Sequence, residues 1–231
     1  MAVVAVSLVN RVEELVSSGE FQLPPVPELA LRLRTALEDA STDREEIVDL
    51  IRSDPTVTVT LLKTENFAAL GFRATNDPSQ AISRLGLRQV QAIVTAVQVQ
   101  GQFETNQDSN KKALETLWNH AIGSAAVAKT LAKRVDYEAD DAFLAGLLHG
   151  IGRLIVLRAL DNLAQVDKDL VLTPSAIDEL AEALQYEMGY STLRNWNFDD
   201  DICEAAHAMS PDLAASTEPI IRIVQAADLI V

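Results

Sequence analysis

The chain has 231 residues, of which 48% are hydrophobic and 23% are charged, a composition typical of a folded globular protein that is long enough to bury a core. Its formal net charge of −15 at pH 7 disfavours binding to nucleic acids and to anionic membrane surfaces, because both require clustered Lys and Arg. Cys203 is the one cysteine, so no intrachain disulfide can form and a reducing cytoplasm is the expected location.

Helical patterns dominate the chain from its beginning. Residues 1–22 start with apolar side chains and soon reach Arg11, Glu13 and Glu14, which predicts an amphipathic helix instead of a signal peptide. Apolar residues then recur at helical spacing, and strand patterns are nearly absent. We therefore predict an all-α fold with helices near residues 3–18, 26–39, 43–53, 55–70, 78–85, 87–103, 111–135, 138–149, 151–160, 174–188, 190–196, 199–209 and 219–231.

Several of these helices begin with a polar residue followed by proline. The pairs are Asp54-Pro55, Asp77-Pro78 and Thr173-Pro174. A short oxygen side chain accepts hydrogen bonds from the free amides of the first turn, and proline lacks a donor that this turn does not need. Thr42 and Glu45 have the spacing of a capping box, which predicts a further helix start at Thr42.

A polar segment rich in Asn, Asp and Gln extends from Glu104 to Lys112 and predicts a linker. It would separate an N-terminal helical lobe, residues 23–104, from a second lobe, residues 110–231. The chain ends at Val231 within an apolar helical pattern that has no capping residue. This favours a domain of a longer chain over a helix that packs at its very end.

The stretch from Ala145 to Leu157 carries the pattern that bears most on chemistry. Its His149 lies in an apolar run and is followed by Gly150, which has no side chain to offer a metal. Glycine costs about 1 kcal/mol relative to alanine inside a helix, so Gly150 and Gly152 predict a kink or a close approach of two backbones. The stretch is also too short to span a bilayer, so no membrane association is expected.

A family resemblance rests on several segments in a fixed order. They are Leu23–Pro27, Arg52–Pro55, Leu61–Asn66, Ala81–Leu87, Leu117–His120 and Ala142–Gly152. Together they resemble the HDOD domain, an HD-related output domain of bacterial signalling proteins, over nearly the whole chain from about Leu23 to Val231. The resemblance implies a multi-helical, HD-domain-like bundle with an additional N-terminal helical lobe.

The resemblance also implies where a metal site would lie. The pattern of the metal-dependent HD phosphohydrolases is a histidine, a later His-Asp pair and a final aspartate. His120 matches the first histidine, His149 the second and Asp228 the final aspartate, whereas Gly150 replaces the aspartate of the pair. With this acid missing we expect no bound cofactor, although weak binding of one divalent metal by the three remaining side chains stays open. A pair of bridged metals is not expected.

Each of these residues also has a purely structural interpretation. His120 and His149 could be hydrogen-bonded, inert core histidines. Asp228 could cap a helix, or pair with a buried histidine or with Arg153. His207 is most simply a surface or packing residue, and it does not match the position of a further family ligand.

The resulting prediction is a cytoplasmic, non-catalytic signalling module that acts through protein contacts. Its partners would be other signalling proteins or an adjacent signalling domain, with the oligomeric state left open. The segment from Asn66 through Phe67 to Arg73 is a candidate docking groove for a partner or ligand. Two alternatives stay open: a weak mononuclear phosphohydrolase acting on a nucleotide, and a sensor that binds a small anionic ligand in the degenerate site.

Overall fold

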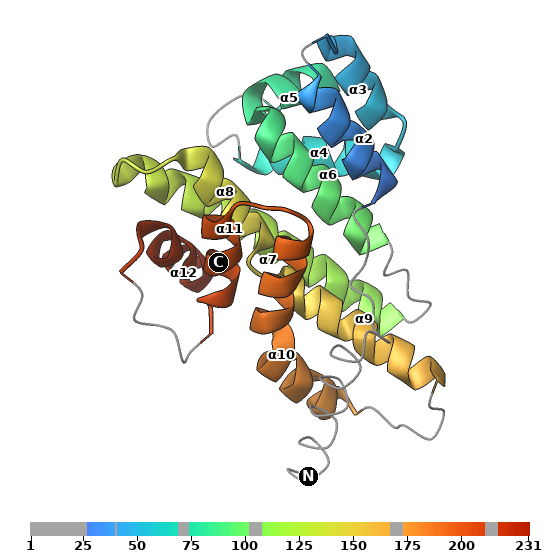
Figure 1. The fold of residues 1–231 in the computed structure, drawn as a ribbon, viewed down its shortest axis with the longest axis vertical. Coiled ribbons are helices and arrows are strands. Elements are labelled where there is room, and N and C mark those ends of the chain that lie inside the picture. Colours follow the sequence, from blue (N-terminus) through green and yellow to red (C-terminus); the bar gives the residue numbers. More distant parts are fainter. Residues whose placement is uncertain (1–26, 40, 69–73, 102–107, 167–172, 211–216) are drawn as a thin grey trace. The chain divides into compact units, whose positions relative to one another are not determined.

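The structure of the chain is a computed structural model that describes residues 27–39, 41–68, 74–101, 108–166, 173–210 and 217–231 (Figure 1). The described residues form helices joined by short turns, and no strand occurs among them. The predicted all-α fold is therefore confirmed. The predicted N-terminal helix within residues 1–22 lies outside the described residues.

The first helices form a compact bundle around an aliphatic core. Their bounds are Glu28–Glu38 (α2), Arg44–Arg52 (α3), Pro55–Ala68 (α4), Pro78–Leu85 (α5) and Leu87–Gly101 (α6). The side chains that fill the space between them are fully or almost fully buried, among them Leu33, Val48, Ile51, Val57, Leu61, Ile82 and Ile93. Burial of such side chains removes apolar area from water, which is the main stabilising contribution to the bundle.

Three further helices belong to the same compact unit of the chain. Their bounds are Asp108–Arg134 (α7), Ala139–Leu148 (α8) and Pro219–Ile230 (α12). Small residues bring them close together: a Cβ on Gly146 of α8 would lie only 2.9 Å from the Cα of Ala125 in α7. Alanines of α7, α8 and α12 meet in a shared core cluster of Ala128, Ala132, Ala142, Ile223 and Ala227.

The remaining helices form a second compact unit. They are Ile151–Val166 (α9), Pro174–Asn195 (α10) and Asp200–His207 (α11). Helices α9 and α10 touch through two glycines, because a Cβ on Gly152 would lie 1.7 Å from the Gln185 carbonyl oxygen and 2.6 Å from the Gly189 nitrogen. The predicted helix break at residue 189 is therefore wrong. Gly189 continues α10 and gives Gly152 room to approach.

The predicted helix starts at the three polar-proline pairs are confirmed. In each case the polar side chain accepts hydrogen bonds from amides of the first turn. The bonds are from Thr56 (2.8 Å) and Val57 (3.1 Å) to Asp54, from Ser79 (3.0 Å) to Asp77, and from Ala176 (3.2 Å) to Thr173. The predicted capping box at Thr42 is wrong by one residue, because Asp43 caps α3 by accepting a 3.0 Å bond from the Glu46 amide.

The predicted linker is helical in its second half, because α7 already begins at Asp108. A polar sequence can form the start of a helix wherever its far end is anchored by packing, as the end of α7 is. The first compact unit holds α2 to α8 and α12, so the chain divides at a different place from the lobes proposed at residues 23–104 and 110–231. These lobes stay a prediction.

One stretch, Ala139–Asp161, has the length and hydropathy of a membrane span. However, 78% of its most apolar window is buried inside the protein, and a turn at residues 149–150 separates α8 from α9 within it. A membrane span exposes its apolar side chains to lipid, whereas these pack against other helices. The burial favours core helices of a soluble protein.

Candidate functional site

The first candidate ligand, His120, lies on α7 and forms a hydrogen bond with Asp228 on α12. The distance between His120 Nε2 and Asp228 Oδ1 is 2.7 Å, although 108 residues separate them in the chain. About one third of each side chain is exposed to solvent, 34% for His120 and 33% for Asp228. The two groups therefore stabilise each other and stay accessible from outside.

Close packing of α7 against α12 brings this pair together. One turn beyond His120, Gly123 contacts Val231, and a Cβ on Gly123 would lie 2.6 Å from Val231 Cγ1. Val231 in turn lies three residues after Asp228, a spacing that places two residues on one face of a helix. The absent side chain at Gly123 is therefore what allows the end of α12 to reach α7.

The second candidate ligand, His149, directly follows the last residue of α8. His149 belongs to the second compact unit, whereas His120 and Asp228 belong to the first. A metal site that joins His149 to these two side chains stays a prediction.

The predicted donor set matches a single divalent cation in type. Two imidazoles and one carboxylate suit Zn, Fe or Mn, with positions left open for water. A metal held by His120 Nε2 and Asp228 Oδ1 would have to displace their 2.7 Å hydrogen bond.

Gly150 occupies the turn between α8 and α9 and is not required there by packing. A Cβ added to it would meet no described atom within 4 Å beyond its chain neighbours, and its φ lies outside the left-handed region. The prediction of a kink or a close backbone approach is confirmed: the chain turns at Gly150, and Gly152 lies close to the backbone of α10. The fold thus leaves room for the first atom of a side chain at position 150, where the resemblance implies an aspartate.

The other reactive side chains in the described residues have structural roles. Cys203 is buried, burial raises the pKa of its thiol to about 11, and the thiol points to the Phe198 carbonyl oxygen at 3.7 Å. His207 contacts Glu187, with 3.3 Å between Nε2 and Oε2, and its ring lies 5.2 Å from that of Tyr190. A buried thiol with a raised pKa is a poor nucleophile, so Cys203 is not prepared for catalysis.

The proposed docking segment is only partly described. Asn66 anchors the chain near the end of α4: its Nδ2 donates to the Thr75 carbonyl at 3.1 Å, and its Oδ1 accepts from the Thr75 amide at 2.8 Å. The side chain of Phe67 and all of Arg73 lie outside the described residues. Asn66 therefore joins the end of α4 to the backbone of Thr75, and docking at this segment stays a prediction.

Sequence reasoning missed a buried charge on the same helix. Glu65 is 2% exposed, and its Oε1 accepts a hydrogen bond from Arg84 Nη1 at 2.9 Å, while its Oε2 has no hydrogen-bond partner among the described residues. The two residues are 19 positions apart, so no spacing rule joins them. A glutamate among the apolar positions of a helix was the available signal.

The sequence is similar to a known domain family and to a bacterial protein. The family model of the HDOD domain matches residues 23–210. An uncharacterized protein of Treponema pallidum (strain Nichols) is 26% identical over 97% of the chain, and the chain spans only 44% of the length of that relative.

Solved structures with the same fold come from several bacteria. A proposed metal-dependent phosphohydrolase from Shewanella amazonensis SB2B superposes with a TM-score of 0.81 at 20% identity, over 98% of this chain and 82% of that one. An HDOD domain protein of unknown function from Geobacter sulfurreducens gives 0.60 at 21% identity, over 97% and 78%. A proposed signal transduction protein from Marinobacter aquaeolei VT8 gives 0.52 at 23% identity, over 90% and 48%.

Proposed function

The chain belongs to the HDOD domain family, and from this premise we propose that it is a non-catalytic signalling module that acts by binding other proteins. The observation that carries the proposal is Gly150. It stands where the resemblance to the metal-dependent HD phosphohydrolases implies an aspartate, in a turn that leaves space for a Cβ. The loss of the carboxylate is therefore a change in chemistry that the packing of the fold does not demand.

The missing carboxylate affects metal binding more than folding. An aspartate at position 150 would add a negative charge beside the cation and a hard oxygen ligand. Without it, His120 and Asp228 satisfy each other through their hydrogen bond, which a metal would have to displace. Both effects weaken metal binding, and phosphoester hydrolysis by a bridged metal pair requires more ligands than these three.

A role in signalling is supported by the relatives and by their lengths. The Marinobacter protein that shares the fold is described as a signal transduction protein, and the Treponema relative is more than twice as long as the aligned region. A module that accompanies other domains can relay their state through contacts. The reduced, buried Cys203 is compatible with the cytoplasm as the place where it works.

Metal content tests the proposal most directly. We would purify the wild-type chain and the Gly150→Asp and Gly150→Asn variants identically, then measure bound Mn, Fe, Ni and Zn by elemental analysis. We expect little metal in the wild type and in Gly150→Asn, and a clear gain in Gly150→Asp, because only aspartate adds charge. Adding Asp228→Asn to Gly150→Asp should remove the gain.

The alternative function is a weak mononuclear phosphohydrolase. It is favoured by the hydrogen-bonded pair of His120 and Asp228, an imidazole and a carboxylate of the kinds that bind a divalent metal. Near-stoichiometric metal in the wild type, together with metal-dependent hydrolysis of bis(4-nitrophenyl) phosphate that Asp228→Asn abolishes, would establish this alternative and overturn the proposal.

A further inference from the structure

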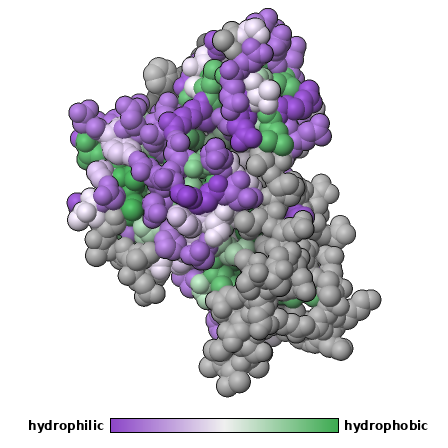
Figure 2. Space-filling model, in the orientation of Figure 1, coloured by the Kyte–Doolittle hydropathy of each residue, from purple (hydrophilic) through white to green (hydrophobic). Residues whose placement is uncertain are grey.

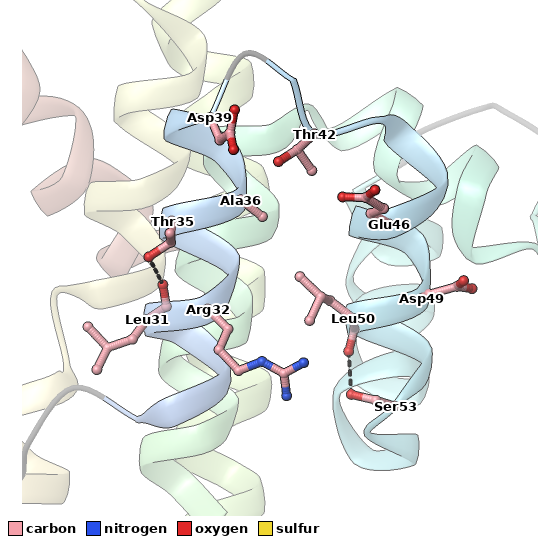
Figure 3. Close-up of a pocket in the computed structure, with 10 residues that line it drawn as sticks. All are labelled: Leu31, Arg32, Thr35, Ala36, Asp39, Thr42, Glu46, Asp49, Leu50 and Ser53. Carbon is pink, nitrogen blue, oxygen red and sulfur yellow. Dashed lines mark hydrogen bonds between the residues drawn. The ribbon is translucent and has the colours of Figure 1, made fainter.

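A cavity lies between α2 and α3 in the N-terminal bundle (Figure 3). Its volume is about 680 Å³, which is enough to hold a small ligand or a few side chains of a partner. The two helices that form its walls run in opposite directions (Figure 3). None of the lining residues is a candidate metal ligand, so the cavity is separate from the site described above.

Three side chains point into this cavity from its two walls (Figure 3). They are Arg32 from α2, and Glu46 and Leu50 from α3. Arg32 and Glu46 lie toward opposite ends of the cavity, and Leu50 lies between them. Leu31 and Asp49 border the cavity but point away from it. The cavity therefore presents a cation, an apolar group and an anion in a row.

The two other carboxylates at the cavity already have partners. Asp39 accepts hydrogen bonds from the amide and the hydroxyl of Ser41, at 2.8 and 2.6 Å, and these bonds lower the pKa of its carboxyl. Asp49 forms an ion pair with Arg52, with 3.4 Å between Oδ1 and Nη1. These two acids therefore contribute less to the recognition of a ligand than their number suggests.

The charges of Arg32 and Glu46 are not neutralised by the protein. Neither the guanidinium nor the carboxylate has a hydrogen-bond or ion-pair partner among the residues that the structure describes. A ligand with charges of only one sign would be attracted at one end of the cavity and repelled at the other. A ligand that carries one charge of each sign would be attracted at both ends.

The apolar part of the cavity is small. Leu50 is half-buried, and the space-filling view shows only limited hydrophobic areas among hydrophilic side chains around α2 and α3 (Figure 2). Apolar contact alone would therefore bind a ligand weakly, since the hydrophobic contribution is proportional to the area removed from water. The two charges are then what select the ligand.

We propose that this cavity binds a short segment of a partner protein that carries an acidic, an apolar and a basic side chain in a row. The acidic side chain would face Arg32, whose guanidinium can hold a carboxylate through two parallel hydrogen bonds. The apolar side chain would contact Leu50, and the basic one would face Glu46. This inference rests on the proposed function, binding to other proteins, and adds the surface and the chemistry of the partner.

Other occupants match the two charges less well. A wholly basic segment would place a cation beside Arg32, and a wholly acidic segment would place an anion beside Glu46. A nucleic acid would bring only phosphates to a chain with a net charge of −15. Each of these occupants has a distinct outcome in the test.

The probe is a fluorescein-labelled helical peptide with Glu, Leu and Lys on one face, at positions i, i+4 and i+7. Two control peptides have Lys in place of the Glu, or Glu in place of the Lys. Binding to the full chain is measured by fluorescence anisotropy. The variants are Arg32→Glu, Glu46→Lys and the double variant. The matched controls are Arg34→Glu and Glu45→Lys, at nearby positions of the same helices that do not line the cavity.

We expect the wild type to prefer the mixed peptide over both controls. Arg32→Glu and Glu46→Lys should each raise its Kd roughly tenfold, because each replaces an attraction by a repulsion. The double variant should restore binding, since opposite charges again lie at the two ends and the peptide can bind in the reverse direction. Arg34→Glu and Glu45→Lys should change Kd by less than about twofold, as exposed charges outside an interface do.

The two single variants separate the proposal from general electrostatic attraction. They change the net charge of the chain in opposite directions, so a general effect would strengthen binding in one and weaken it in the other. That result would overturn the proposal, as would preference for a control peptide, absence of binding to the mixed peptide, or equal effects of the variants and their matched controls. Thermal melting verifies that each variant is folded. The metal measurements on position 150 do not involve this cavity, so failure of this inference and failure of the non-catalytic function are distinguishable.

Discussion

Asp228 Oδ1 and His120 Nε2 are 2.7 Å apart, so the last described helix of the chain is joined to α7 by a bond between two candidate metal ligands. A metal held by this same nitrogen and oxygen would compete with the hydrogen bond. Position 150 has no side chain to bind a metal, and the fold holds His120 and Asp228 in their hydrogen bond. His120 and Asp228 therefore have a structural role, because they connect two helices.

This connection should be measurable as stability. Asp228→Ala removes the acceptor of the bond, and we expect a loss of about 1 kcal/mol in the free energy of unfolding, the usual magnitude for a partly exposed hydrogen bond. Urea denaturation followed by circular dichroism measures it. Arg222→Ala, at an exposed position of the same helix, is the control and should change the free energy by less. Equal effects would show that the bond does not stabilise the docking of α12.

Two glycines separated by one residue should respond in opposite directions to alanine. Gly152→Ala places a Cβ 1.7 Å from the Gln185 carbonyl oxygen, so α9 and α10 must separate, and we expect a loss of about 3 kcal/mol or more. Gly150→Ala places its Cβ in open space and should be neutral or stabilise by up to about 1 kcal/mol, because it restricts the unfolded chain. The midpoints of urea unfolding compare the two. A large loss in Gly150→Ala would contradict the open environment of residue 150.

The two bonds from Asn66 to Thr75 predict a local structural role. Thr75 is 5% exposed, so its amide and carbonyl cannot turn to water when Asn66→Ala removes their partners. We expect a loss of about 2 kcal/mol in the free energy of unfolding, the cost of leaving such groups unsatisfied. Asn76→Ala, at an exposed position beside Thr75, is the control. If the two variants are equally stable, the hydrogen bonds from Asn66 do not stabilise the folded chain, and docking is then the remaining role predicted for Asn66.

Cys203 predicts a dependence of stability on pH. Burial raises the pKa of its thiol from the ordinary value of 9.0 to about 11 in the folded chain. Between these values the folded state holds the proton more firmly than the unfolded state, so stability should fall as pH rises from about 9 to about 11. Guanidinium unfolding at several pH values in that range measures the decline. Cys203→Ala should show a shallower decline, and identical slopes would contradict the burial effect.

Reactivity of the same thiol gives a further measurement. The thiolate is the reacting species, and a pKa near 11 leaves little of it at pH 8. We expect Ellman's reagent to modify Cys203 slowly in the native protein and rapidly in guanidinium. Fast modification without denaturant would show that α11 opens more often than its packing indicates.

Local signals predicted the helices well, because helix starts depend on a few neighbouring residues. The caps at Asp54, Asp77 and Thr173 are formed within three residues of the chain and were confirmed. Gly189 was misinterpreted because glycine marks a helix end and a close helix contact equally well. Only the partner helix, with Gly152 at the contact, distinguishes the two.

The candidate site depends on contacts between residues that are far apart in the chain, which local sequence patterns do not predict. His120 and Asp228 are 108 residues apart, so no local pattern predicts their hydrogen bond, and they were paired only through a family resemblance. A cavity between α2 and α3 was missed for a related reason. Glu46 and Leu50, which line it, are ordinary residues of an amphipathic helix, and the cavity depends on how the two helices are spaced.

The open space beside Gly150 has an evolutionary consequence. Glycine codons that end in a pyrimidine become aspartate codons by one base change, so many genes for such a chain are a single mutation away from an aspartate at position 150. The fold sets no barrier at the Cβ against that step. If glycine nevertheless persists at position 150 as the gene evolves, selection and not the geometry of the fold has excluded the carboxylate. Selection would then favour a site that lacks this metal ligand.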